Sequence, residues 1–513
     1  MSNKEAFVAS IREGYTFKGE SFRIGSAMLN GEVVPGTPVS IPLKTMNRHG
    51  LIAGATGTGK TKTLQLIAEG LSDASVPVLL MDIKGDLSGI AAAGSLNPKI
   101  SERVQLMEME YQPAAFPVEL LSLSNEKGVR LRATITEFGP VLLSKILNLN
   151  DTQEGLVALI FKYCDDHQLP LLDLQDFIKV LQYIGNEGKK EIEKEYGKIS
   201  TSSTGTILRK IIELQQQGAD VFFGEPSFDI DDLMRIADDG RGIISVLRVT
   251  DMQNRPKLFS TFMLQLLAEL YATLPEAGDT DKPVLVLFID EAHLVFQEAT
   301  EALLQQVETV IKLIRSKGVG IFFCTQNPQD IPAPVLSQLG LKVQHALRAF
   351  TAADRKTIKQ AAANYPETAF YKTEDLLTQL GIGEALVTAL NEKGIPTPLV
   401  HTMLVPPRSR MDVLTEAEID HLVARSSLVK KYATVTDRES AHEILTARLQ
   451  EAAAKSAEKE KEGKKTSGGR REKSPLEQVL DNSVTRQIGR TAVSIITRSL
   501  LGALGLGSRK RRY

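Results

Sequence analysis

The chain has 513 residues, of which 42% are hydrophobic and 24% are charged, and its formal net charge is −2 at pH 7. This length exceeds what one compact core accommodates, so two or three units are expected, and the composition is that of a soluble globular protein. The sequence contains no signal-peptide pattern and no run of about 18 apolar residues, which excludes a membrane-spanning helix. The two cysteines, Cys164 and Cys324, lie far apart in apolar surroundings, so we expect no disulfide framework and a cytoplasmic location.

Residues 1–48 combine short apolar pairs with the turn signals Asn30-Gly31 and Pro35-Gly36. This pattern predicts a short β-rich leader that caps the edge of a larger domain, because about fifty residues are too few for a sizeable barrel of their own.

The segment Gly54-Ala55-Thr56-Gly57-Thr58-Gly59-Lys60-Thr61 matches the phosphate-loop pattern G-x-x-x-x-G-K-[ST] in full. An apolar strand at residues 49–53 precedes it and a helix follows it, as this loop requires. Glycines allow backbone N–H groups to surround phosphate oxygens, the lysine reaches the β- and γ-phosphates, and the threonine hydroxyl ligates Mg²⁺. The sequence therefore predicts a nucleoside triphosphate site formed by Gly54, Ala55, Thr56, Gly57, Thr58, Gly59, Lys60, Thr61 and Lys62.

The next predicted strand, residues 77–83, runs into the polar string Asp82-Ile83-Lys84-Gly85-Asp86. Ligand-binding groups gather at the carboxyl edge of open α/β sheets, but a charged loop on the surface explains the string equally well.

Residues 140–240 show helical spacing of apolar residues, for example at Phe177, Leu181 and Ile184, and predict an α-helical insertion. Within it, residues 200–205 are expected to form a loop before a helix at 206–217. The polar loops of this insertion are candidates for contact with a protein partner, although solvated loops are the more frequent case.

The sheet is predicted to resume at 242–247, followed by a helix at 259–274 and by a strand that ends in Asp290-Glu291. An apolar strand closing on two acids, placed after a phosphate loop, is typical of an ATP-hydrolysing site. Asp290 would hold Mg²⁺ through water and Glu291 would polarise the attacking water.

A predicted helix at 299–317 leads to a strand at 319–324 and then to Gln326, a candidate sensor of the γ-phosphate at the strand tip. Further strands are expected at 342–347, 384–390 and 397–405. A basic or helical segment is expected at 349–362, between the first two of them. We expect at least one strand to lie between the phosphate-loop strand and the Asp-Glu strand, as in ATP-driven motor domains.

After residue 450 the composition changes. Residues 451–513 hold 15 Lys+Arg against 7 Asp+Glu, whereas the preceding 450 residues hold 46 against 56. We predict a charged linker at 451–475 and a basic amphipathic C-terminal helix at 476–513. Such a tail suits a partner subunit, a nucleic-acid backbone or an anionic membrane surface.

These motifs together resemble the HerA/FtsK superfamily of ring-forming ATPases, and especially the bacterial HerA-like C-terminal-domain family. The likeness rests on the phosphate loop and on further segments along nearly the whole chain, such as Asp82-Ile83-Lys84-Gly85-Asp86, Ile289-Asp290-Glu291-Ala292-His293 and Arg315-Ser316-Lys317-Gly318-Val319-Gly320 leading to Thr325-Gln326-Asn327-Pro328. The Asp-Glu-Ala-His string also matches superfamily-2 helicases, but their second motor domain is not evident. The barrel domain of HerA, and the membrane helices and winged-helix domain of FtsK, have no counterpart here.

The resemblance implies a RecA-like α/β fold, with core segments 49–139 and 241–450, and Mg²⁺-dependent hydrolysis of ATP. It also implies Gln326 as the strand-tip sensor, Arg315 as an arginine finger, and a homo-oligomer, with a hexameric ring as a candidate. Three functions stay open: translocation or unwinding of double-stranded DNA, remodelling of a protein partner bound to the insertion or the tail, and a nucleotide-gated scaffold.

Overall fold

The computed structural model describes residues 3–463 apart from 125, 252–254, 279, 297–300, 350 and 434–438, and the predicted C-terminal helix at 476–513 lies outside these residues. The chain forms two compact units, one of Met1–Leu131 with Phe228–Thr434 and one of Arg132–Ser227 with Val435–Tyr513. Within the described residues, no helix is long and apolar enough to cross a membrane.

The first unit is built on a twelve-stranded sheet in the order β2-β1-β12-β11-β10-β3-β9-β8-β4-β7-β5-β6. Strands β10 to β6 of this order run parallel, and β11, β12, β1 and β2 continue the sheet in antiparallel fashion. The strands are β1 Ser21–Leu29, β2 Glu32–Pro42, β3 Gly50–Ala53, β4 Val78–Asp82, β5 Val118–Ser122, β6 Val129–Arg130, β7 Ile244–Arg248, β8 Leu285–Ile289, β9 Val319–Thr325, β10 Leu341–Gln344, β11 Glu384–Thr388 and β12 Val400–Leu404.

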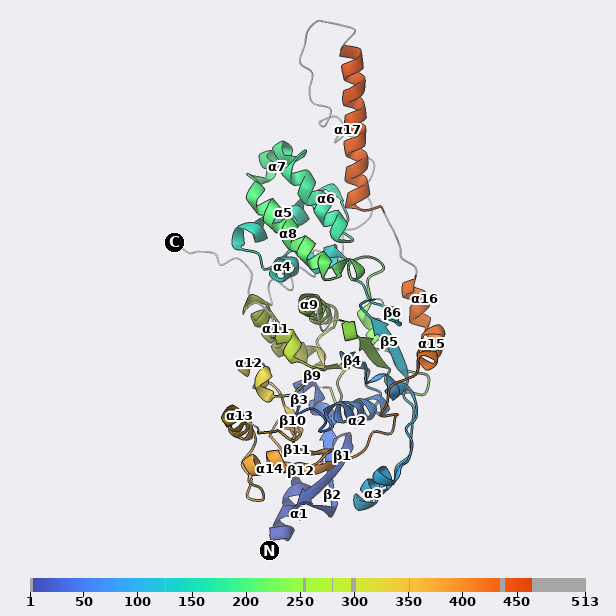
Figure 1. The fold of residues 1–513 in the computed structure, drawn as a ribbon, viewed down its shortest axis with the longest axis vertical. Helices are drawn as coiled ribbons and strands as arrows, with labels where there is room; N and C mark the ends of the chain where they lie inside the picture. Colours follow the sequence, from blue (N-terminus) through green and yellow to red (C-terminus); the bar gives the residue numbers. More distant parts are fainter. Residues whose placement is uncertain are drawn as a thin grey trace. The chain divides into compact units, whose positions relative to one another are not determined.

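Helices accompany these strands along the chain (Figure 1). They are α1 Asn3–Gly14, α2 Lys60–Asp73, α3 Pro98–Leu106, α9 Pro256–Thr273, α10 His293–Phe296, α11 Glu301–Ile314, α12 Ala333–Leu336, α13 Ala352–Ala362, α14 Thr373–Gln379, α15 Glu416–Arg425 and α16 Ser427–Ala433. Short 3-10 turns include η1 Leu43–Arg48, η2 Ser88–Ala91, η4 Ile230–Leu233, η6 Arg315–Lys317 and η7 Pro328–Asp330.

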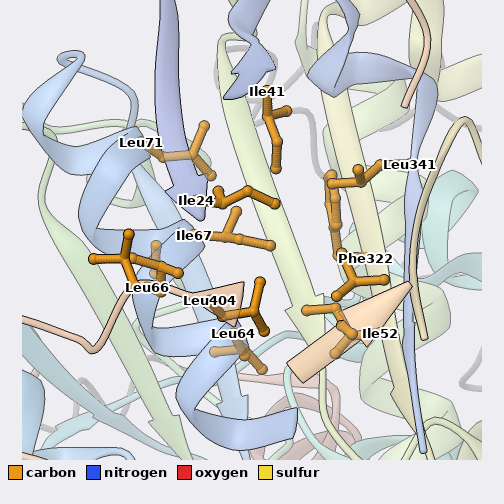
Figure 2. Packing of buried hydrophobic residues seen from close by; sticks show 14 of the residues in the cluster. Ile24, Ile41, Ile52, Leu64, Leu66, Ile67, Leu71, Phe322, Leu341 and Leu404 are labelled. Carbon is orange, nitrogen blue, oxygen red and sulfur yellow. The ribbon is translucent and has the colours of Figure 1, made fainter. Parts of the chain in front are cut away.

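Successive side chains of the parallel strands point to opposite faces of the sheet, and both faces are buried. On β9, Phe322 joins the core that includes Leu64 and Ile67 of α2 (Figure 2), whereas the ring of Phe323 lies 5.7 Å from that of Phe296 in α10. Each fully buried side chain of this size contributes about 1.5–3 kcal/mol relative to an exposed one. The central strands are therefore held from both sides, which keeps their carboxyl ends in fixed positions.

The strand order confirms the RecA-like α/β fold, because β9 lies between the phosphate-loop strand β3 and the Asp-Glu strand β8. The N-terminal residues differ from the prediction of strands alone. Residues 3–14 form helix α1, which buries Phe7 and Ile11 at helical spacing, and only then do β1 and β2 extend the sheet beside β12. The two buried residues are one turn apart, a signal too short to predict a helix from sequence.

The second unit is helical, with α4 Ile135–Ile146, α5 Asp151–His167, α6 Leu174–Gly185, α7 Lys189–Tyr196, α8 Thr201–Gln216, η3 Ala219–Val221 and α17 Ala441–Gly463. Phe177, Leu181 and Ile184 are buried, as their spacing predicts. The loop predicted at 200–205 is wrong. Helix α8 begins at Thr201 because the Ser200 side chain accepts the N–H of Ser203 and caps the helix.

Candidate functional site

The phosphate loop joins the end of β3 to the start of α2. Gly54, Gly57 and Gly59 have φ angles of 153°, 78° and 112°, a region that other residues rarely adopt. Two hydrogen bonds fix the loop to β9 and to the segment after β10, since Gly54 N–H donates to Thr325 O at 3.2 Å and Ala55 N–H to Ala346 O at 2.8 Å. The loop therefore has the backbone conformation that its glycine pattern predicts.

The N-terminus of α2 is suited to bind an anion. Its N-cap is Gly59, and no side chain caps the helix, so the first N–H groups are available to a ligand. Lys60 is buried, and its ammonium donates to Ala55 O at 3.1 Å across the loop. Burial lowers the pKa of Lys60, and the nearby Lys84 ammonium lowers it further, while the carboxylates of Glu291 and Asp290 oppose both effects.

Thr61 is the second residue of α2 and is partly buried, next to Lys60. The ammonium of Lys62 is hydrogen-bonded to Met411 O at 2.5 Å, in the segment that follows β12. Lys62 can therefore serve a phosphate through its backbone N–H, while its side chain ties the helix to that segment.

Asp290 and Glu291 follow β8, at the same sheet edge as the phosphate loop. Ile289 pairs with Phe323 of β9, whose last residue pairs with the last residue of β3, and Ala292 N–H donates to Cys324 O at 2.9 Å. Asp290 is 2% exposed, and its Oδ2 has no hydrogen-bond partner in the part of the chain that the structure describes. Burial raises the pKa of Asp290 to about 6, although Lys84 opposes this rise. A buried carboxylate oxygen without a partner is what a cation or its bound water would satisfy.

Glu291 adopts a φ of 44°, which is unusual for a residue with a side chain. Its Oε1 forms an ion pair with the ammonium of Lys84, and its Oε2 lies 3.2 Å from Nδ1 of His293. Lys84 is missing from the residues predicted for the site. The polar string 82–86 pointed to this segment in the sequence, but only the adjacency of β4 and β8 shows that Lys84 contacts Glu291.

Gln326 is exposed just after β9, between the phosphate loop and the Asp-Glu strand, where a strand-tip sensor would lie. The turn that carries it is fixed by Asp330, whose Oδ2 accepts the Thr325 hydroxyl at 2.5 Å and the Asn327 N–H at 3.1 Å.

Arg315 lies at the opposite edge of the sheet, in η6 before the first residue of β9, and is exposed. The seven residues of β9 separate it from the phosphate-loop edge, a span of roughly 23 Å at 3.3 Å per residue. The structure thus brings Lys60, Asp290, Glu291 and Gln326 to one edge and leaves Arg315 outside the site of its own chain.

His345 is a second residue at this edge that the sequence pattern did not reveal. It follows β10, donates its N–H to Ala53 O at 2.7 Å, and its Nε2 lies 2.8 Å from the Thr63 hydroxyl. A Cβ added to Gly54 would lie 2.5 Å from the His345 Cβ, so the two backbones pack closely. Burial, with a further contribution from Lys60, lowers the pKa of His345 to about 4 and keeps it neutral. The neutral His345 therefore packs against the phosphate loop and helps to fix its position.

The described residues contain no group of three or more His, Cys, Asp or Glu arranged to hold a metal ion by themselves. Asp290 with the Thr61 hydroxyl instead offers the sparse, oxygen-only set that suits Mg²⁺, which commonly takes its remaining ligands from substrate phosphates and water.

Comparison with known proteins identifies the family of this chain. Residues 28–511 match the family model described as helicase HerA-like C-terminal. The chain is 21% identical over 384 residues to the DNA double-strand break repair helicase HerA of Sulfolobus acidocaldarius, covering 73% of this chain and 69% of that protein. It is 23% identical over 394 residues to the HerA of Saccharolobus solfataricus, covering 75% and 69%.

Among solved structures, the bacterial conjugative coupling protein TrwB, without its first 70 residues, aligns with a TM-score of 0.50 at 13% identity. The alignment covers 80% of this chain and 94% of that one, and it supports the fold alone. The chain belongs to the helicase HerA-like C-terminal family and is a helicase-like P-loop ATPase of the HerA/FtsK type.

Proposed function

We propose that this chain hydrolyses ATP with Mg²⁺ and uses the energy to move along double-stranded DNA as a homo-oligomeric ring. The observation that carries the proposal is the meeting of the phosphate loop with Asp290 and Glu291 at one sheet edge. The relatives named DNA double-strand break repair helicase favour DNA as the polymer.

The residues divide the chemistry between them. Lys60 and the first N–H groups of α2 bind the β- and γ-phosphates, and Thr61 and Asp290 hold Mg²⁺. The metal, when bound, neutralises charge on the phosphate oxygens. Glu291 orients a water and accepts its proton as the oxygen attacks the γ-phosphorus and the bond to the β,γ-bridging oxygen breaks. Gln326 contacts the γ-phosphoryl group and reports its presence to β9.

Arg315 acts on a neighbouring subunit in this proposal, because it lies far from its own phosphate loop along β9. An arginine supplied in trans stabilises charge on the γ-phosphoryl group and is worth about 10³–10⁵ in turnover in related chemistry. Arg315→Ala should lower turnover strongly while nucleotide affinity stays unchanged. Titrating Arg315→Ala subunits into wild-type rings tests the arrangement, since action in trans requires them to inhibit their wild-type neighbours.

The deciding experiment measures steady-state ATPase activity with and without double-stranded DNA at low and moderate salt, together with the mass of the assembly. We expect stimulation by DNA that weakens as salt rises, because phosphate contacts release counterions. Lys60→Ala should abolish nucleotide binding and turnover, whereas Glu291→Gln should keep binding and lose turnover. ATPase activity that ignores DNA would instead favour remodelling of a protein partner through the helical unit or the tail.

A further inference from the structure

Lys84 and Glu291 come from neighbouring parallel strands. Met81 of β4 pairs with Ile289 of β8, so the segments that follow both strands leave the sheet side by side. The ammonium of Lys84 contacts Oε1 of Glu291, whose side chain is 7% exposed, while that of Lys84 is 35% exposed. The group proposed to activate water is therefore held by a cation that has access to solvent.

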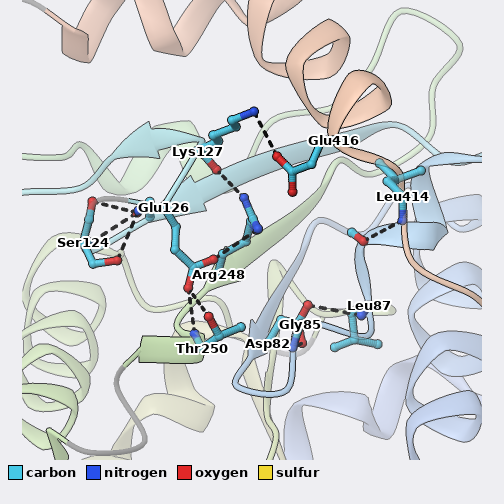
Figure 3. A network of polar contacts seen from close by, with 12 residues as sticks. Asp82, Gly85, Leu87, Ser124, Glu126, Lys127, Arg248, Thr250, Leu414 and Glu416 are labelled. Carbon is cyan, nitrogen blue, oxygen red and sulfur yellow. Dashed lines mark hydrogen bonds and ion pairs between the residues drawn. The ribbon is translucent and has the colours of Figure 1, made fainter.

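The backbone that carries Lys84 is fixed. The buried carboxylate of Asp82 accepts the N–H groups of Gly85, Asp86 and Leu87 at 2.7, 3.1 and 3.1 Å (Figure 3). Gly85 takes a φ of 77°, which allows the tight turn. Motion of the Lys84 ammonium is thus confined to rotation of its own long side chain.

The next strand reinforces this turn. Gly85 lies against Thr250, since an added Cβ would sit 3.0 Å from its Cγ2. Glu126 accepts the Thr250 N–H at 3.0 Å and pairs with Arg248 at 3.2 Å, as Figure 3 shows. The sheet edge beside Lys84 is consequently tied together by polar contacts rather than left as a free loop.

Lys84 also interacts electrostatically with Lys60, so two ammonium groups lie near the edge that carries the phosphate loop. Two cations at a phosphate-binding edge leave the space between them favourable to an anion. A γ-phosphate carries more charge than the Glu291 carboxylate and would compete with it for Lys84.

We propose that Lys84 exchanges partners during the ATPase cycle, holding Glu291 when the γ-phosphate is absent and moving to the γ-phosphate when ATP binds. This inference rests on the proposed ATPase function. The exchange frees Oε1 of Glu291 to bind the attacking water, while Oε2 stays beside Nδ1 of His293. ADP has no γ-phosphate and leaves the Lys84–Glu291 pair intact, so Glu291 becomes active only with the triphosphate bound.

The test compares affinities for a non-hydrolysable ATP analogue and for ADP, both with Mg²⁺, in wild type, Lys84→Met, Glu291→Gln and the double variant. Lys84→Met should weaken the analogue about tenfold, as expected for a lost charged hydrogen bond, and change ADP affinity less than about twofold. Glu291→Gln removes the competing charge, so it should tighten analogue binding in the presence of Lys84 and have no such effect in Lys84→Met.

Turnover gives a second readout. Lys84→Met should lower kcat about tenfold or more, Lys84→Arg should restore part of it, and Lys127→Met should match wild type because Lys127 pairs with Glu416 and Asp420 on the surface. If Lys84→Met leaves the ratio of analogue affinity to ADP affinity unchanged, the proposed exchange is wrong. A kcat of Lys84→Met above that of wild type would also contradict it. An inactive wild-type protein would instead contradict the proposed ATPase function.

Discussion

Asp176 in the helical unit and Asp290 at the edge of the sheet are both almost fully buried, at 1% and 2% exposure, yet their surroundings differ. Asp176 Oδ2 accepts the N–H groups of Leu172 and Asp173 at 2.8 and 3.1 Å, and its Oδ1 accepts that of His442 at 2.8 Å. Asp290 Oδ2 has no hydrogen-bond partner among the described residues, and burial raises its pKa to about 6.

We interpret this difference as the one between a structural carboxylate and the carboxylate that we propose binds Mg²⁺. Asp176 completes the capping box of α6, whose N-cap is Asp173, and it accepts the His442 N–H from the first turn of α17, so these contacts stabilise the fold. Glu69 of α2 does the same in the first unit, where it accepts the N–H groups of Arg408 and Ser409. A buried oxygen without a partner costs about 1–3 kcal/mol, and a fold retains such a cost where a bound cation repays it.

The largest effect should be seen in turnover. Asp290→Asn removes the charge that would hold Mg²⁺ and should lower kcat by about 100-fold or more, whereas Asp176→Asn should stay within about twofold of wild type. Steady-state ATPase assays on both variants, at saturating Mg²⁺ and ATP, check this. A similar loss of kcat in the two variants would contradict the different roles assigned to the two carboxylates.

The free energy of unfolding should show the opposite order, with the larger loss in Asp176→Asn. Asp176→Asn replaces an acceptor of N–H bonds by an amide that presents one oxygen, and should cost about 1–3 kcal/mol of unfolding free energy. Asp290→Asn removes an unpaired buried charge and should be neutral or stabilising without ligands. Urea unfolding of the nucleotide-free proteins measures both, and a marked destabilisation by Asp290→Asn would show that this residue also serves the fold.

A smaller effect on stability is expected from His49, which is buried in its neutral form. His49 accepts the Ile321 N–H on Nδ1 at 3.1 Å and contacts Ile311 O through Nε2 at 2.8 Å. Burial lowers the pKa of His49 to about 4, so as the pH falls from 7 towards 4 the unfolded chain gains a proton that the folded chain does not. Wild type should therefore lose stability over this window.

His49→Gln lacks this titration. It should be less stable than wild type at pH 7 by about 1 kcal/mol, because one hydrogen bond is impaired, and the gap should narrow as the pH falls to 4.5. Urea midpoints at a series of pH values measure it. A gap that is constant with pH would mean that His49 titrates normally in the folded protein.

Local patterns were enough to predict the parts of the site whose conformation is set by nearby residues. The phosphate loop needs glycines at positive φ and a helix directly after it, and residues 54–61 supply both within eight positions. The apolar strand ending in Asp290-Glu291 and the helices within 140–240 were predictable for the same reason, although residues 228–240 belong to the first unit and form no α-helix. The leader was not, because α1 depends on only two buried side chains, Phe7 and Ile11.

Tertiary structure alone decided which of these segments meet. Lys84 reaches Glu291 because β4 lies beside β8, and His345 supports Gly54 because β10 lies beside β3, although some 200 to 290 positions of sequence separate the partners. Strand order is set by how all the helices cover both faces of the sheet, so no local pattern encodes it. The sequence by itself therefore determined the phosphate loop, and the packing of the sheet decided that Lys84 pairs with Glu291 and that Arg315 lies at the opposite edge.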